Sequence, residues 1–122
     1  MAIDLTKIPL SPVVEANGLL FLSGQLGFKE PGVLVEGGIV EQTRQVFSNI
    51  ENVLAMHGAQ LSDIVKTTVW LTDKQTFHDF NTVYGNYFAQ GTYPARSTVV
   101  SGLLVEGALI EIEVIARKPL SA

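Results

Sequence analysis

The 122-residue chain contains no cysteine, which excludes a disulfide framework and any thiolate chemistry. Basic residues are also few, and apart from one adjacent pair near the C-terminus they are scattered: Lys7, Lys29, Arg44, Lys66, Lys74, Arg96, Arg117 and Lys118. Nucleic-acid binding usually needs a basic patch that neutralises phosphates. The scatter, together with a net charge of −4, therefore argues against a nucleic-acid partner.

Long apolar runs are absent as well. No stretch approaches the roughly 18 apolar residues of a membrane span, and the start "MAIDLTKIPLSPVV" lacks the apolar core of a signal peptide. We therefore expect a protein without a membrane anchor, and a cytoplasmic location fits this pattern. The length predicts one domain, residues 1–122, with a full hydrophobic core.

Charged residues are scarce for a monomer. They make up 16% of the chain, against 47% hydrophobic residues, whereas about 25% charged residues is usual for a soluble domain. A low charge is expected when part of the surface is buried against other copies of the chain. The composition therefore favours a homo-oligomer.

The hydrophobic pattern predicts an α+β domain. Asn17-Gly18 between apolar runs indicates a hairpin over Val13–Gln25, and the glycine-rich residues 27–38 resemble a loop. Helical spacing of apolar residues follows from Ile39 to a stop at Gly58, and again over residues 74–91. Further strands are expected at residues 61–73, 95–100 and 108–116, with "AIDL" (residues 2–5) as a candidate extra strand. These elements predict a two-layer fold: a mixed six-stranded sheet with two helices on one face.

The other face of that sheet is predicted to be an interface. In the last strand, Ile110, Ile112, Val114 and Ala116 share one side, which suits the helices, whereas Leu109, Glu111, Glu113 and Ile115 share the other. In the strand expected within residues 61–73, the side chains predicted to face the helices are Val65, Thr67, Val69 and Leu71. Those predicted to face the other side are Ile64, Lys66, Thr68 and Trp70. A free sheet face that carries Trp and Ile is suited to subunit contact.

Arg96 and Glu111 are the candidate catalytic pair. Arg96 lies in "YPARSTVV", near the start of a β-branched strand, and Glu111 lies in the last strand. We expect the two strands to be neighbours and both side chains to share the interfacial sheet face. An arginine on a strand offers a two-pronged donor that matches a substrate carboxylate. From pattern alone, a structural ion pair between Arg96 and Glu111 is the simpler interpretation.

Two further features have weaker signals. Gly24 in "SGQ" (residues 23–25) lets the backbone approach a ligand closely, although a β-bulge or strand end explains it as well. His57 and His78 have no second ligand at a metal-site spacing, and no GxSxG, P-loop or dinucleotide motif is present. Pattern alone therefore ends at an α+β oligomer with a candidate carboxylate-binding arginine.

Five sequence blocks carry more than a pattern of residue types. "LLFLSGQLG", "QTRQVFSNIENVLAMHGAQLSDIVKTTVWLTD", "FNTVYGNYF", "YPARSTV" and "IEIEVIA" occur in the order typical of the reactive intermediate deaminase family (RidA/YjgF, also named L-PSP endoribonucleases). The chain resembles that family from about Pro9 to Ala116. The resemblance implies a chorismate-mutase-like fold and a homotrimer with a central sheet barrel and clefts between subunits. It also implies hydrolysis of enamine and imine intermediates, of the 2-aminoacrylate and 2-aminocrotonate type, to 2-keto acids and ammonia without cofactor or metal.

The resemblance assigns roles to individual residues. Arg96 matches the arginine that grips the substrate carboxylate, and Glu111 matches the glutamate beside the attacking water. The remaining pocket residues implied are Ser23, Gly24, Asn81 and Thr98, with Leu10 in the N-terminal segment. The chain differs from the family in having Leu10 for a frequent Tyr, Thr98 for a frequent Cys and Leu104-Val105 for Leu-Pro.

Three alternative functions stay open. Leu10 in place of Tyr favours a wider cleft, and hence deamination of a larger enamine acid such as 2-aminomuconate. A ribonuclease or translation inhibitor is the second, although the acidic balance weighs against it. The third is a non-catalytic trimer that binds 2-keto acids.

Overall fold

A computed structural model describes residues 7–120 of the chain. It contains an N-terminal hairpin, a short strand, a second hairpin, and then helices alternating with longer strands. The elements are β1 (Val13–Ala16), β2 (Leu19–Leu22), β3 (Gln25–Leu26), β4 (Phe28–Glu30), β5 (Val33–Leu34), α1 (Gly38–Ala55), β6 (Ile64–Leu71), α2 (Phe77–Gly85), β7 (Ala95–Val100) and β8 (Ile110–Arg117), with 3-10 turns at Leu61–Asp63 and Lys74–Thr76. The candidate strand at residues 2–5 lies outside the described residues.

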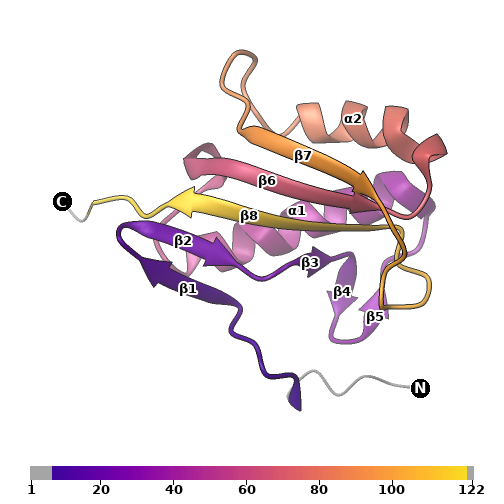
Figure 1. Cartoon of the computed structure of the whole chain (residues 1–122), viewed down its shortest axis with the longest axis horizontal. Coiled ribbons are helices and arrows are strands. Elements are labelled where there is room, and N and C mark those ends of the chain that lie inside the picture. The colour runs from indigo at the N-terminus through magenta and orange to yellow at the C-terminus, as the bar shows by residue number, and fades with distance from the viewer. Residues whose placement is uncertain (1–6, 121–122) are drawn as a thin grey trace.

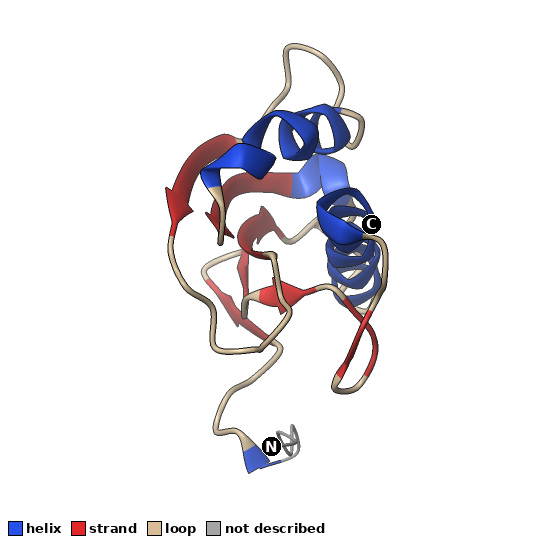
Figure 2. Ribbon diagram, turned by 90° about the vertical axis from the view of Figure 1, so that its right-hand side faces the viewer, coloured by secondary structure: helices blue, strands red, loops and turns tan. Residues whose placement is uncertain are grey.

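The strands form the predicted mixed six-stranded sheet. Its order is β1-β2-β8-β6-β7, and β3 also pairs with β8. The β6–β7 pair is parallel, and the other pairs in this sheet are antiparallel. Both helices lie on one side of the sheet, and the opposite face is open (Figures 1 and 2). The two-layer α+β prediction is therefore confirmed, except that β6, rather than β8, is the neighbour of β7.

The alternation of β8 places its apolar side chains under the helices. Its helix-side residues are all buried, and they are Ile110, Ile112, Val114 and Ala116. In β6 the same holds for Thr67, Val69 and Leu71. The prediction for Ile64 was wrong, because Ile64 is 5% exposed and belongs to the core. A register shift between Ile64 and Lys66 inserts one residue into β6, and such a bulge reverses the faces of the residues before it.

The first hairpin was predicted from its turn residues, whereas the second was not predicted. Asn17 and Gly18 have φ angles of 51° and 77°, the positive values that a two-residue hairpin turn requires. Residues 27–38 were predicted as a loop, but Phe28–Glu30 and Val33–Leu34 pair as a second, two-stranded sheet. Gly32, with φ of 78°, makes its turn. Strands of two and three residues are too short for a period-two pattern to be recognised.

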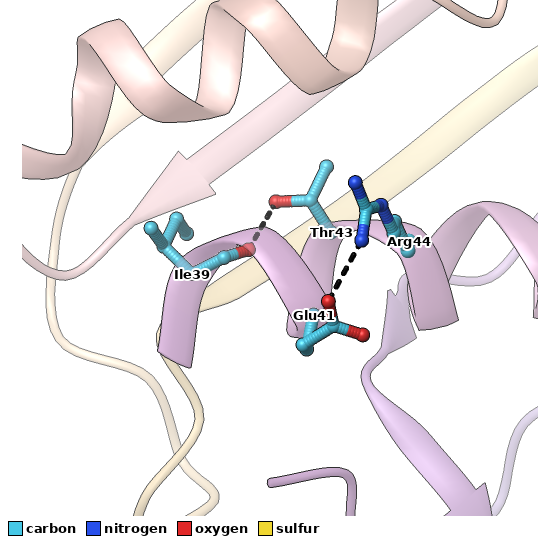
Figure 3. A network of polar contacts seen from close by, with 4 residues as sticks. All are labelled: Ile39, Glu41, Thr43 and Arg44. Atoms are coloured by element: carbon cyan, nitrogen blue, oxygen red, sulfur yellow. Dashed lines mark hydrogen bonds and ion pairs between the residues drawn. The ribbon is translucent and has the colours of Figure 1, made fainter. Parts of the chain in front are cut away.

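Helix α1 has two polar side-chain contacts in its first turns and ends shortly before a glycine. Near its start Thr43, which is fully buried, donates its hydroxyl proton to the Ile39 carbonyl at 2.7 Å, and Arg44 pairs with Glu41 at 2.8 Å on the exposed side (Figure 3). At its end Gly58 has φ of 74°, which confirms the predicted stop. Helix α2 is shorter than predicted: Asp73 caps the preceding 3-10 turn, and α2 itself ends at Gly85.

Two side-chain amides of α1, the buried Gln42 and the partly buried Asn49, fix the loops around the sheet. Gln42 donates to the Gly107 carbonyl at 3.0 Å and accepts from the Leu109 N–H at 2.8 Å. Asn49 donates to the carbonyls of Leu26 and Phe28 at 3.0 and 2.9 Å. Both side chains therefore tie segments far apart in the sequence to one helix. Within residues 7–120, no helix is long and apolar enough to cross a membrane.

The open face and its edge carry apolar side chains in contact with solvent. Phe21, on β2, is 41% exposed on the open face. Strand β7 is the edge strand beside β6, and its Val99 and Val100 are 44% and 54% exposed. A solvated sheet edge with apolar side chains is a template for association. The single chain thus presents the surface that the low charge content predicts.

Candidate functional site

Arg96 is placed by β7 and lies on the helix side of the sheet. In the parallel β6–β7 pair it stands next to Thr67, whose side chain is buried under the helices. The guanidinium carbon lies 4.8 Å from the ring centroid of Tyr84 and 5.4 Å from that of Phe80, both in α2. Within residues 7–120 no carboxylate forms an ion pair with Arg96. The five N–H donors of the guanidinium are therefore not used by an acid of this chain.

A hollow of about 370 Å³ opens beside this guanidinium. It is lined by Asn81, Tyr84, Gly85, Tyr93, Pro94 and Arg96. Thr98 lies two residues along β7 on the same side as Arg96, next to Val69. We refer to Arg96, Asn81, Tyr93 and Thr98 as the arginine half-site. The structure therefore brings together three of the predicted site residues, namely Arg96, Asn81 and Thr98, on one side of the sheet.

Glu111 is placed by β8 and lies on the open face. It pairs with Trp70 of β6, on the side opposite to the buried Ile110 and Ile112. Its carboxylate lies against the backbone of Gly24: a Cβ added there would overlap the carboxylate oxygen Oε2 and lie 2.9 Å from Cδ. Gly24 is thus required for space next to Glu111.

The segment around Gly24 is an irregularity between two strands that both pair with β8. Phe21 pairs with Ile115 and Gln25 with Ile112, so four residue steps along this segment match three along β8. This is the extra residue of a bulge, as the simpler interpretation of "SGQ" predicted. Ser23 donates its hydroxyl proton to the Ser11 carbonyl at 2.6 Å, which holds the segment with Leu10 nearby. Leu10 itself is 58% exposed.

We refer to Ser23, Gly24, Glu111 and Leu10 as the glutamate half-site. Its carboxylate has an unusual environment, because removal from water, and secondarily the negative charge of Glu113, raise the pKa of Glu111. No hydrogen-bond donor or cation among the described residues pairs with it. A carboxylate with a raised pKa and no partner is suited to accept and return a proton.

The sheet separates the two half-sites within one chain. Arg96 faces α2, whereas Glu111 faces the open side, and β6 lies between their strands. The expectation that the two share one sheet face was therefore wrong, and so was the simpler interpretation of an Arg96–Glu111 ion pair. The reason is topological: β7 runs parallel to β6, and in that register Arg96 stands beside the buried Thr67.

The aromatic rings under Arg96 are site residues that the sequence pattern does not reveal. The spacing of Phe77, Phe80 and Tyr84 indicates one apolar stripe, which is typical of a helix face in the core. The structure shows that the stripe has a second use, because all three rings lie within 5.8 Å of the guanidinium carbon. No group of three His, Asp or Glu side chains in residues 7–120 is arranged to hold a metal ion.

Comparison with known proteins shows the family of the chain. The family model described as endoribonuclease L-PSP matches residues 4–118. A mouse protein named 2-iminobutanoate/2-iminopropanoate deaminase is 38% identical over 109 residues, which cover 88% of this chain and 80% of the mouse protein.

Two solved structures give the same result in three dimensions. A Yersinia pestis protein of the conserved Rid family superposes with a TM-score of 0.83 and 45% identity, over 89% of this chain and 87% of that one. RidA from an Antarctic Psychrobacter superposes with a TM-score of 0.83 and 37% identity, over 91% and 89%. The chain therefore belongs to the endoribonuclease L-PSP family, the reactive intermediate deaminase (RidA/YjgF) family that its sequence motifs predicted.

Proposed function

We propose that the protein hydrolyses small 2-imino acids and their enamine tautomers, of the 2-aminoacrylate and 2-aminocrotonate type, to 2-keto acids and ammonia. The observation that carries the proposal is the Arg96 guanidinium, which borders a hollow and has no anionic partner among the described residues. Such a group is a ready receptor for a carboxylate, which it binds through two parallel N–H···O bonds. The mouse relative is named for substrates of this class.

The chemistry requires one acid–base group and no cofactor. Arg96 holds the carboxylate and so fixes the adjacent C=N carbon. Glu111 accepts a proton from a water molecule whose oxygen attacks that carbon, which forms a carbinolamine. Starting from the protonated imine, this carbinolamine is neutral, and Glu111 then returns the proton to its nitrogen. As the C–N bond breaks and ammonia leaves, Glu111 accepts the hydroxyl proton, and the C=O bond of the keto acid forms.

The site is completed between copies of the chain. One chain separates its arginine from its glutamate by the thickness of a sheet, so a substrate held by Arg96 does not reach Glu111 of the same chain. The apolar open face and the solvated edge β7 supply surfaces for association. We therefore infer that, in the homotrimer that the family resemblance implies, the arginine half-site of one subunit meets the glutamate half-site of the next.

Ribonuclease activity is the less favoured alternative. The family description names it, but RNA binding needs a concentrated positive surface. The chain has a net charge of −4. Its exposed Arg44 and its Lys118 are moreover paired with Glu41 and Glu15.

Replacing Arg96 tests the carboxylate receptor. Arg96→Lys keeps the charge but loses the two-pronged geometry, so kcat/KM for 2-aminoacrylate generated in situ should fall roughly 10- to 100-fold, the worth of one charge-assisted hydrogen bond. Arg96→Ala should lose more. Arg44→Lys, which alters an exposed arginine of α1, is the matched control and should keep full activity. Equal rates for wild type and Arg96→Ala would contradict the assignment.

Adding a methyl group at Gly24 tests the position of Glu111. In Gly24→Ala the new Cβ displaces the carboxylate, which is the flexible end of its side chain. We expect kcat to fall roughly 10- to 100-fold, part of what a positioned acid–base group contributes, while the free energy of unfolding changes by less than about 0.5 kcal/mol. Gly102→Ala, where a Cβ meets nothing within 4 Å, should change neither. Unchanged kcat in a folded Gly24→Ala variant would show that Glu111 is not the base.

The pH dependence of kcat/KM tests the role of Glu111 through a change at its neighbour Glu113. As a base, Glu111 works deprotonated, so kcat/KM should fall as pH drops through its pKa, which lies above the usual 4.5. Glu113→Gln removes a nearby negative charge and therefore lowers the pKa of Glu111, so the acid limb should move to lower pH. Glu51→Gln, an exposed change on α1, should leave the limb in place. An acid limb that stays fixed or moves upward in Glu113→Gln would contradict this role.

A further inference from the structure

Three rings of helix α2 lie under the Arg96 guanidinium. They belong to Phe77, Phe80 and Tyr84, at 5.8, 5.4 and 4.8 Å between the guanidinium carbon and each ring centroid. Their spacing along the chain, three and then four residues, places them on one face of the helix. A cation over an aromatic face is attracted by the ring quadrupole, so α2 presents a surface on which the guanidinium rests.

Tyr84 differs from the other two rings because it is also fixed to the sheet. Its side chain is 4% exposed, and its hydroxyl forms a hydrogen bond of 2.8 Å with the fully buried Thr67 hydroxyl. Thr67 is the residue of β6 that stands beside Arg96 of β7. The ring closest to the guanidinium is therefore anchored to the strand position next to the arginine itself.

This arrangement limits the motion of a long side chain without using its donors. An arginine loses up to about 2 kcal/mol of side-chain entropy when it is ordered, and an ion pair that ordered it would also occupy the N–H groups. The rings attract the guanidinium without an N–H···O bond, so its donors stay available for a carboxylate. Burial raises the pKa of Tyr84, so the ring stays a neutral phenol and its hydroxyl keeps its bond to Thr67 at neutral pH.

We propose that Tyr84 is a positioning residue for Arg96: its ring supports the guanidinium, and its hydrogen bond to Thr67 fixes that ring. The inference rests on the proposed function, in which Arg96 receives the substrate carboxylate. Tyr84 does not touch the reacting atoms. It determines how much of the time Arg96 is held in the geometry that accepts a carboxylate.

The first test measures binding without turnover. In the full-length oligomer, titration calorimetry with 2-oxobutanoate, a product-like keto acid, gives Kd directly. Tyr84→Leu removes the ring and should weaken binding by about three- to tenfold, which lies between the values for an exposed and for a desolvated cation–π contact. KM for the imine should rise with little change in kcat, because binding is lost equally in the ground state and the transition state.

Tyr87→Leu is the matched control. Tyr87 is a neighbouring aromatic residue that follows α2, and its ring stacks on Phe47, with centroids 4.2 Å apart, rather than on Arg96. The variant therefore loses aromatic packing of a similar kind. It should lower the free energy of unfolding and leave Kd for 2-oxobutanoate unchanged.

A second pair of variants separates positioning from stability. Tyr84→Phe keeps the ring but leaves the Thr67 hydroxyl buried and unpaired, so it should lower both stability and affinity. Adding Thr67→Val removes the unpaired hydroxyl, and stability should recover. Affinity should stay about threefold below wild type, because the ring is still not tied to β6.

Results that contradict the role of Tyr84 can be distinguished from results that contradict the proposed function. If Arg96→Ala binds 2-oxobutanoate as wild type does, the proposed function fails. If Arg96→Ala loses binding while Tyr84→Leu keeps Kd within about twofold of wild type, the carboxylate receptor stands and the role of Tyr84 is wrong. Affinity that returns to wild type together with stability in the Tyr84→Phe, Thr67→Val double variant would show that the Thr67 bond acts only through stability.

Discussion

The contact between the Arg96 guanidinium and the aromatic face of α2 sets the direction in which the arginine points. In the parallel β6–β7 pair, the residue beside Thr67 faces the helices, and no acidic side chain among the described residues forms an ion pair with the cation there. The rings of Phe80 and Tyr84 lie 5.4 and 4.8 Å from the guanidinium carbon and attract it instead. Much of the site follows from this contact, because it holds the charge beside the hollow and forms no N–H···O bond with the guanidinium donors.

The pairing of β7 with β6 places Arg96, and with it this contact, on the side of the sheet opposite to Glu111. The glutamate depends on a second local feature, the extra residue at Ser23-Gly24, which opens space for its carboxylate. Each half-site is thus built within one chain, and in the proposed reaction neither is sufficient alone. In the trimer that we propose, association through the apolar open face and the β7 edge joins the two half-sites. Activity then requires the oligomer.

Much of the fold was predictable from the sequence, because its signals are local and repeated. Alternation in β8, the Asn17-Gly18 turn and the Gly58 stop each act within a few residues. The errors have two structural causes. The register shift after Ile64 reversed the face on which its side chain lies. The pairing of β7 with β6 placed Arg96 on the opposite side of the sheet from Glu111. The sequence motifs predicted the site residues, but the direction of side chains on β7 depends on long-range pairing that no local pattern encodes.

The most direct test of a site shared between subunits is to mix two inactive chains. Arg96→Ala retains the glutamate half-site and Glu111→Gln retains the arginine half-site, so co-refolded trimers should recover about a quarter of wild-type activity, since one interface in four then combines both intact residues. Mixing either variant with the Arg96→Ala, Glu111→Gln double variant should recover none. If mixed oligomers form, as shown by native mass spectrometry, and remain inactive, the site does not lie between subunits and the proposed trimeric active site is wrong.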